Sequence, residues 1–237
     1  MEKNIAIIPA RSGSKGIRDK NIKLLSGKPL LVYSIETALD SKLFDCIHVS
    51  TDSEKYAEIA RENGADVPFL RSAAMSSDTA GSWDAVREVI RNYEKIGRKF
   101  DTVTLLQPTS PLRNKDDIIG AYKMFLEKDA DIVVTVCKSE VSPEICNTLT
   151  SDQSMHKFSD DNNRRRQDMP SYYRLNGAVY IIKTNIAKTD FSLYQERSYA
   201  YIMPQERSVD IDTELDFKYA EFLIGGADRV KSLPDNK

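Results

Sequence analysis

The sequence predicts an α/β fold with a mostly parallel central sheet that is flanked by helices. Three observations carry this prediction. Short apolar runs, several rich in β-branched residues, alternate with longer segments whose apolar residues recur at helical spacing. This βαβα order favours parallel strands joined by crossover helices. A hydrophobic fraction of 41% in 237 residues is enough for a packed core.

Strands are expected where the apolar runs are short, and helices where one face of a longer segment is apolar. The expected strands are residues 5–9, 46–50, 67–70, 102–106, 131–136, 172–183 and 199–203. The expected helices are residues 29–39, 53–63, 82–96, 116–126 and 213–223. Pro29 is placed in the first turn of its helix, Asp52 or Ser53 caps the second helix, and Gly64 ends it.

The alternation stops between residues 139 and 171, a polar stretch that contains "DDNNRRRQD". A loop longer than about 12–15 residues is usually functional or disordered. We therefore expect one domain over residues 1–237 with an insertion at about 139–171, and no internal repeat. The alternative is a mobile surface loop.

Composition excludes several classes of protein. A net charge of −2 argues against a nucleic-acid partner for the chain as a whole. No apolar run approaches the roughly 18 residues of a membrane span, and the N-terminal run is too short for a signal peptide. Three widely spaced cysteines and two histidines give little material for disulfides, zinc or a Ser-His-Asp triad. A soluble, cytoplasmic protein is expected.

The first strand is followed by a long cationic loop in "NIAIIPARSGSKGIRDKN". Glycines in such a loop allow backbone N–H groups to approach an anion, and open α/β sheets bind ligands at the carboxyl ends of strands. The sequence has neither GxxxxGK[ST] nor GxGxxG here. A phosphate-binding loop and a solvated turn both remain open. The residues concerned are Arg11, Gly13, Lys15, Gly16, Arg18 and Lys20.

Two carboxylates stand two positions apart in "SVDIDTELDF". Alternate residues of an extended segment share a face, so Asp210 and Asp212 would point the same way. Such a pair suits Mg²⁺, or Mn²⁺ in its place, with water and substrate phosphate completing the shell. The alternative is helix capping by Asp212 or Thr213, with Glu214 in the first turn.

Three further stretches carry polar residues that suit a ligand. "LLQPTSPLR" places Gln107, Thr109 and Ser110 between two prolines, which rigidify the loop. "MSSDTAGSWDAV" leads into a helix whose free N–H groups can bind an anion, unless Ser82 is a plain cap. "RRRQDMPSYYRLNGA" offers arginines for a carboxylate, unless they form a solvated loop.

Taken in order, these motifs resemble those of one family. "IIPARSGSKGIRDKN", "VSTD", "SSDTAGS", "LLQPTSPLR", "RLNGAVYI" and "DIDTELDF" are similar to stretches of the acylneuraminate cytidylyltransferases, the CMP-sialic acid synthetases, over about residues 4–224. The resemblance implies a Rossmann-like, GT-A-like nucleotidyltransferase. It would join CTP to a nine-carbon 2-keto sugar acid and release pyrophosphate.

The resemblance also implies roles for individual residues, with the catalytic ones being Arg11, Lys20 and Asp212. The nucleotide-binding positions are Ala10, Arg11, Lys15, Lys20, Asn21, Arg71, Ala80 and Ser82. The sugar-side positions are Gln107, Thr109, Arg166 and Arg174. The metal-binding positions are Asp210 and Asp212. The general base stays open between Asp212 and a water on the metal.

The identity of the sugar stays open. Some sialic acid enzymes have a lysine in the insertion, and "SPEICNTL" offers none and is similar to legionaminic acid enzymes. An enzyme for 3-deoxy-octulosonate and a nucleotide-binding regulator without catalysis are the alternatives. The resemblance implies a homodimer in which the insertion reaches the partner subunit, with apolar contacts from Val141, Ile145, Leu149 and Met155.

Overall fold

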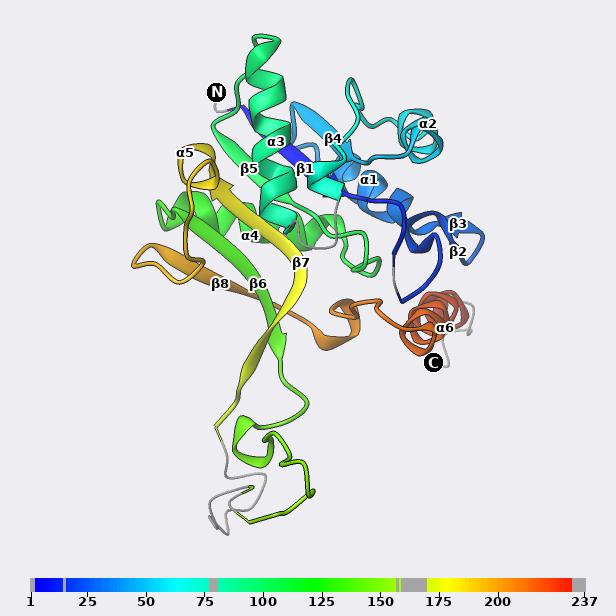
Figure 1. The fold of residues 1–237 in the computed structure, drawn as a ribbon, viewed down its shortest axis with the longest axis vertical. Coiled ribbons are helices and arrows are strands. Elements are labelled where there is room, and N and C mark those ends of the chain that lie inside the picture. Colours follow the sequence, from blue (N-terminus) through cyan, green and yellow to red (C-terminus); the bar gives the residue numbers. More distant parts are fainter. Residues whose placement is uncertain (1–2, 15, 77–80, 157, 159–169, 232–237) are drawn as a thin grey trace, which may run out of the picture.

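The computed structural model describes residues 3–14, 16–76, 81–156, 158 and 170–231. Its centre is a six-stranded sheet with the order β4-β1-β5-β7-β6-β8 (Figure 1). The strands are β1 (Asn4–Pro9), β4 (Cys46–Ser50), β5 (Thr102–Leu105), β6 (Ile132–Lys138), β7 (Tyr173–Lys183) and β8 (Ser198–Met203). The pairs of β1 with β4, β1 with β5, and β6 with β8 are parallel, whereas β7 runs antiparallel to both of its neighbours. The predicted α/β fold with a mostly parallel sheet is confirmed.

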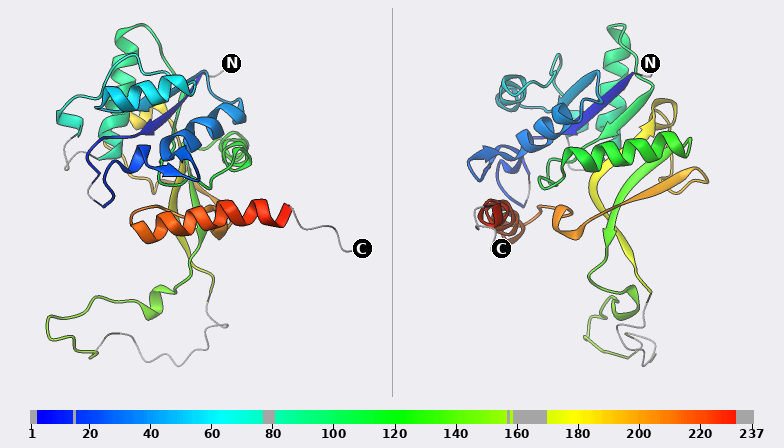
Figure 2. Two further views of the ribbon diagram at one scale, coloured as in Figure 1. Left: turned by 90° about the vertical axis from the view of Figure 1, so that its right-hand side faces the viewer. Right: turned by 180° about the vertical axis from the view of Figure 1, so that it is seen from behind.

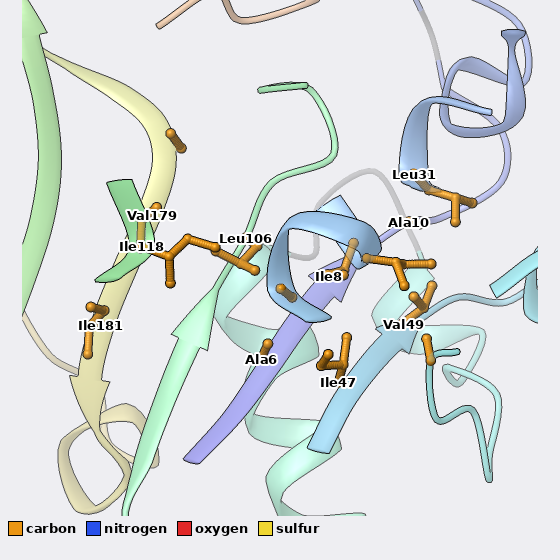
Figure 3. Close-up of a cluster of buried hydrophobic side chains, with 14 of the residues drawn as sticks. Ala6, Ile8, Ala10, Leu31, Ile47, Val49, Leu106, Ile118, Val179 and Ile181 are labelled. Atoms are coloured by element: carbon orange, nitrogen blue, oxygen red, sulfur yellow. The ribbon is translucent and has the colours of Figure 1, made fainter. Parts of the chain in front are cut away.

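Helices cover both faces of the sheet (Figure 2). The helices are α1 (Leu30–Ser41), α2 (Glu54–Glu62), α3 (Ser82–Lys95), α4 (Lys115–Glu127), α5 (Thr184–Ala187) and α6 (Glu214–Lys231). Side chains of α1, α2 and α4 pack on one face, and those of α3 and α5 pack on the other. The face under α1 and α4 is drawn in Figure 3, where Ile8, Leu31 and Ile118 belong to one cluster of buried side chains and Ile118 lies beside Leu106.

A third apolar cluster attaches α6 to the first loop. Ile17 of the loop, Leu25 of the short hairpin β2 (Leu24–Leu25) and β3 (Lys28–Pro29), and Phe217 of α6 are all buried together. The hairpin turns at Ser26 and Gly27, which have φ values of +47° and +82°. This cluster places the start of α6, and therefore the Asp210–Asp212 segment, beside the first loop.

The structure corrects three expectations about elements. Residues 67–70 form no strand: Asp66 makes one bridge to His48, and Pro68 then has no N–H for a ladder. Pro29 precedes α1 instead of starting it, because it pairs in β3. The last helix continues past the expected end at residue 223 and runs through Gly225 and Gly226. Glycine, unlike proline, keeps the backbone N–H that a helix needs.

The segment between β6 and β7 lies at the end of a twisted two-stranded ribbon that extends away from the helices (Figures 1 and 2). Its described part contains one 3₁₀ turn, Pro143–Ile145. Val141, Ile145, Leu149 and Met155 are each between 44% and 64% exposed. The apolar side chains that were expected to make a contact are therefore uncovered in the single chain.

Candidate active site

The candidate active site is a pocket of about 520 Å³ at the carboxyl ends of β1 and β5. Segments far apart in the sequence form it: the first loop, Arg71, the start of α3, the loop after β5, and the residues just before α6. Ligand sites of open α/β sheets lie at this edge. We call it the main pocket. Among the predicted residues its lining includes Arg11, Lys20, Asn21, Arg71, Ser82, Gln107, Thr109, Asp210 and Asp212.

The first loop is held by side chains of the β4–α2 connection. The backbone N–H and the hydroxyl of Ser12 each donate to the Asp52 carboxylate at 2.7 Å. Burial acts to raise the pKa of Asp52, but the bonds from Ser12 outweigh it and hold the pKa below its usual value. Tyr56 of α2 donates to Asp19 further along the loop at 3.0 Å. Of the two residues predicted to cap the second helix, Ser53 occupies the N-cap position, and Asp52 holds the first loop instead.

Two residues of the loop fix its shape and its position in the pocket. Asn21 is buried and donates to the Arg11 carbonyl at 3.0 Å, so it shapes the loop. Gly16 approaches the Asp212 backbone so closely that a Cβ there would lie 2.6 Å from the carbonyl oxygen. Only glycine fits at this position without a shift of the backbone.

Lys20 connects the cationic loop to the acidic segment. Its ammonium group donates to the Ile211 carbonyl at 2.6 Å and to Asp212 Oδ1 at 3.2 Å. The Lys20 side chain is 13% exposed, whereas that of Asp212 is 77% exposed. A cation with little exposure thus lines the pocket, paired with an exposed carboxylate.

Arg71 forms another wall of the main pocket. Its Nε donates to the Ser50 hydroxyl at 3.0 Å, and its Nη2 donates to the Ser50 carbonyl at 2.7 Å. Burial lowers the pKa of Arg71, and nearby Asp52 and Glu88 oppose this shift. The guanidinium is therefore fixed by neutral groups and retains charge for a ligand.

Asp210 and Asp212 both line the main pocket, as their spacing predicted. Burial raises the pKa of Asp210, the charge of Asp212 raises it further, and a hydrogen bond from Thr109 opposes them. Asp210 Oδ1 is buried and has no hydrogen-bond partner among the described residues. Helix capping explains neither carboxylate, because Thr213 and Asp216 cap α6 with each other at 2.7–3.3 Å.

The loop after β5 faces the acidic segment. The Ile211 N–H donates to the Thr109 carbonyl at 2.8 Å, which joins the loop to the chain between the two aspartates. Gln107 lies against Gly177 of β7, where a Cβ would be 2.5 Å from the Gln107 amide oxygen. Gly177 has a φ of +72° and lies within the register shift of β7.

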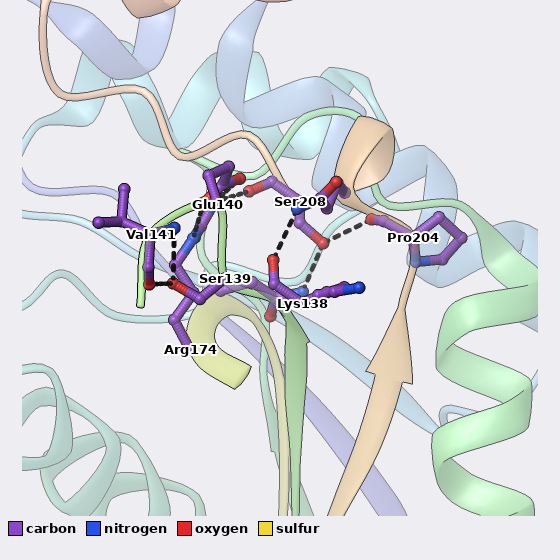
Figure 4. A network of polar contacts seen from close by, with 9 residues as sticks. Lys138, Ser139, Glu140, Val141, Arg174, Pro204 and Ser208 are labelled. Carbon is purple, nitrogen blue, oxygen red and sulfur yellow. Dashed lines mark hydrogen bonds and ion pairs between the residues drawn. The ribbon is translucent and has the colours of Figure 1, made fainter. Parts of the chain in front are cut away.

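Two predicted residues lie outside the main pocket. The side chain of Ala10 is fully buried in the core, so only its backbone is near the site. Arg174 lines a second pocket of about 510 Å³ on the other side of Asp210, which we call the Arg174 pocket. There Arg174 bonds to Glu140 at 3.2 and 3.3 Å and to the Ser208 carbonyl at 3.5 Å (Figure 4). The predicted positions Lys15, Ala80 and Arg166 lie outside the described residues.

Several residues that hold the site were not predicted from the sequence. Asp52 was proposed only as a cap, and Arg113 and Asn176 were given no role. Asn176 is buried and donates to the Ser208 hydroxyl at 2.9 Å, while its side-chain oxygen accepts from Thr135 at 2.7 Å. The available sequence signal for these residues was a polar side chain in or next to a strand. Such a signal does not indicate which distant segment the side chain contacts.

The main pocket brings cationic side chains and two carboxylates together. The chain matches the family description "Cytidylyltransferase" over residues 5–230, and it belongs to that family. It is therefore a nucleotidyltransferase.

Three relatives show which members of the family the chain is similar to. It is 40% identical over 91% of its length to an N-acylneuraminate cytidylyltransferase of Streptococcus agalactiae, of which it spans 52%. It is 34% identical over 93% of its length to a CMP-N,N'-diacetyllegionaminic acid synthase of Legionella pneumophila, of which it spans 95%. It is also 34% identical over 93% of its length to a pseudaminic acid cytidylyltransferase of Campylobacter jejuni, of which it spans 96%.

The fold has a counterpart among solved structures. A CMP-2-keto-3-deoxy-manno-octonic acid synthetase in complex with CTP superposes with a TM-score of 0.72, covering 95% of this chain and 99% of that one. The sequence identity is 16%, so this likeness supports the fold alone. The chain spans about half the length of the streptococcal relative and nearly all of the Legionella and Campylobacter relatives. None of the helices in the described ranges has the length and apolar character that a membrane span needs.

Proposed function

We propose that this protein transfers a cytidylyl group from CTP to a nine-carbon acidic sugar of the N-acylneuraminate or legionaminate type. The observation that carries this proposal is the meeting of Arg11, Lys20 and Arg71 with Asp210 and Asp212 around one pocket. Three cations match a triphosphate, and two carboxylates match a divalent cation. The family membership and the names of its relatives support the same activity.

The reaction is an in-line displacement. The anomeric hydroxyl oxygen of the sugar attacks the α-phosphorus of CTP, a new O–P bond forms, and the bond to the β-phosphate breaks. Pyrophosphate leaves with the bonding electron pair, and the hydroxyl proton passes to solvent or to a carboxylate. Arg11 and Lys20 neutralise charge on the phosphates as it develops, and this electrostatic stabilisation lowers the barrier. We assign the cytidine part to Arg71 and Ser82, and the sugar side to Gln107 and Thr109, because the family resemblance implies these roles and all four residues line the main pocket.

Mg²⁺ is proposed as the cofactor, and the residues present fit it. Asp210 has a buried oxygen without a partner among the described residues, which is an open position for a ligand. No group of three or more metal-binding side chains occurs in the described ranges, so water and substrate oxygens would complete the shell. Bound Mg²⁺ would neutralise triphosphate charge, while Asp210 and Asp212 hold it in place.

A panel of sugars tests the activity. The purified protein is incubated with CTP, Mg²⁺ and one acid at a time, and release of pyrophosphate is measured. The acids are N-acetylneuraminate, N,N'-diacetyllegionaminate, pseudaminate and 3-deoxy-octulosonate. We expect turnover with a nine-carbon acid. Turnover with 3-deoxy-octulosonate alone would reassign the substrate, and CTP binding without turnover on any acid would favour a regulator.

We also propose a cytoplasmic homodimer. The apolar side chains of the segment after β6 are exposed in the single chain, and an isologous contact would cover them on both subunits at once. The cysteines Cys46, Cys137 and Cys146 are free, which suits a reducing compartment. Light scattering at low micromolar concentration should give twice the chain mass of 26.8 kDa. A mass of one chain would reject the dimer.

A further inference from the structure

Arg113 ends the motif "LLQPTSPLR", and its guanidinium is buried behind the main pocket. The residue is 2% exposed. Its Nη1 donates to the Ala178 carbonyl at 2.8 Å and to the Gln107 carbonyl at 3.2 Å, and its Nη2 donates to the Ser34 hydroxyl at 2.5 Å. Its Nε has no hydrogen-bond partner in the part of the chain that the structure describes. All of its bonds go to neutral oxygens.

A buried cation without a bonded carboxylate is costly, because the protein interior solvates charge less well than water. Burial lowers the pKa of Arg113 to about 10, and the charge of Asp117 only partly opposes this shift. Asp117 is itself engaged by Arg207 through two bonds of 2.9 Å. A charge held at this cost suggests that the guanidinium has a role in joining two parts of the structure.

The guanidinium connects the loop after β5 to strand β7. Gln107 begins this loop, and Ala178 follows Gly177, the residue against which the Gln107 amide packs. Further along the loop, the Thr109 carbonyl accepts a bond from the N–H of Ile211, the residue next to Asp210, at 2.8 Å. The position of Asp210 therefore depends on a loop whose first carbonyl is held by Arg113.

We propose that Arg113 is a positioning residue, which fixes the Gln107–Thr109 loop and thereby sets the affinity of the main pocket for the divalent cation and for the sugar. This inference rests on the proposed function. Arg113 touches no substrate, since it is covered by the loop it holds. In the first loop, the ammonium group of Lys20 bonds to Ile211 and Asp212, so the proposed phosphate side is held by other contacts and CTP should be affected least.

The test replaces Arg113 by lysine, which keeps the charge but not the planar fork that reaches three oxygens at once. Residues that orient a metal ligand typically change affinity or activity about 10- to 100-fold when altered. For Arg113→Lys we expect a rise of that order in the Mn²⁺ dissociation constant, measured by electron paramagnetic resonance without substrate. The KM for sugar should rise in parallel, and the KM for CTP should change less than about threefold.

Two further variants separate positioning from stability. Val103→Ala creates a cavity in the same strand, β5, and serves as the control, since Val103 is fully buried in the core away from the pocket. It should lower the melting temperature and leave Mn²⁺ affinity and both KM values unchanged. Ser34→Ala removes one partner of Arg113 and also the 3.4 Å bond from the Ser34 hydroxyl to the Gln107 carbonyl, and it should shift the same constants as Arg113→Lys by a smaller factor.

Wild-type Mn²⁺ affinity and sugar KM in Arg113→Lys would overturn the inference and leave Arg113 a purely structural residue. If Arg113→Lys does not fold, Ser34→Ala decides in the same way. The Mn²⁺ titration does not depend on turnover. A wild-type protein that forms no CMP-sugar would therefore defeat the proposed function, while the Mn²⁺ constants would still decide the role of Arg113.

Discussion

Asp210 separates two pockets that hold their charged residues differently. In the main pocket Arg71 is anchored by the neutral Ser50, and Lys20 is held in part by a backbone carbonyl, so positive charge remains for a ligand. In the Arg174 pocket the guanidinium is paired with Glu140, and the same pairing raises the pKa of Arg174. The two pockets therefore differ in how their cations are held: the guanidinium of Arg71 bonds to a serine, whereas that of Arg174 bonds to a carboxylate.

Removal of the metal should have the largest effect. Chelation by EDTA should abolish turnover, and added Mg²⁺ or Mn²⁺ should restore it, because the triphosphate charge would otherwise be uncompensated beside Asp210 and Asp212. Asp210→Asn should resist restoration by any metal concentration that saturates the wild type. Pyrophosphate release is the measurement. Full activity in EDTA would show that the aspartates have another role.

The next largest effect is expected for Lys20→Ala. The loss of a fixed charge that stabilises a transition state costs about 10²–10³ in kcat. The fold should remain intact, because the bonds of the Lys20 ammonium within the described residues go to the exposed Asp212 and to one backbone carbonyl. Steady-state kinetics and circular dichroism check the two statements. Wild-type turnover in a folded variant would place the catalytic charge elsewhere.

A variant at the buried His48 tests whether the stability of the core near Arg71 can change while the main pocket keeps its affinity for CTP. Burial lowers the pKa of His48 to about 3, and its Nδ1 lies 3.1 Å from the Tyr93 hydroxyl. The unfolded state binds a proton near pH 6.5, so the fold loses stability as the pH falls below that value. The charged or titratable neighbours are Cys46, Asp66, Arg71, Tyr93 and Arg98.

At pH 5 this loss should be about 2 kcal/mol in the wild type, and it should be absent in His48→Gln. Urea unfolding at pH 5 and pH 7.5 measures it. The KM for CTP at pH 7.5 should be unchanged in the variant, since His48 does not line the pocket. An equal loss of stability with pH in both proteins would assign the acid sensitivity to other groups.

A matched pair of glycine variants isolates the contact between Gly177 and Gln107. Gly177 and Gly97 have φ values of +72° and +79°, but a Cβ at Gly97 would meet nothing within 4 Å. Gly97→Ala therefore carries the backbone strain alone. Gly177→Ala should add a displacement of the Gln107 amide and raise the KM for sugar about tenfold. Equal kinetics in the two variants would show that Gln107 does not bind sugar.

The smallest effect is expected for Arg174→Met. The sequence analysis placed Arg174 at the sugar acid, whereas in the single chain it is paired with Glu140. An ion pair with this exposure contributes little, about 0–1 kcal/mol. If Arg174 stays paired, the KM for sugar should change less than about threefold. A much larger rise, with the KM for CTP unchanged, would show that Arg174 leaves Glu140 to bind the sugar carboxylate.

The sequence by itself determined the alternation of strands and helices, because hydrophobic periodicity is a local property of the chain. It also determined that Asp210 and Asp212 share a face, since this follows from the pleat of extended backbone. The first loop was identified from its cations and glycines alone. Each of these inferences depends on residues that are close together in the sequence.

Only the tertiary structure decided which segments meet. The hairpin of β2 and β3, the loop residue Ile17 and helix α6 pack into one cluster, and this packing brings Lys20 to Asp212 across 192 positions of sequence. The structure also decided that Asp52 holds the first loop instead of a helix end, and that Arg174 faces the second pocket. These contacts depend on the order of strands in the sheet, which long-range packing selects and local sequence does not encode.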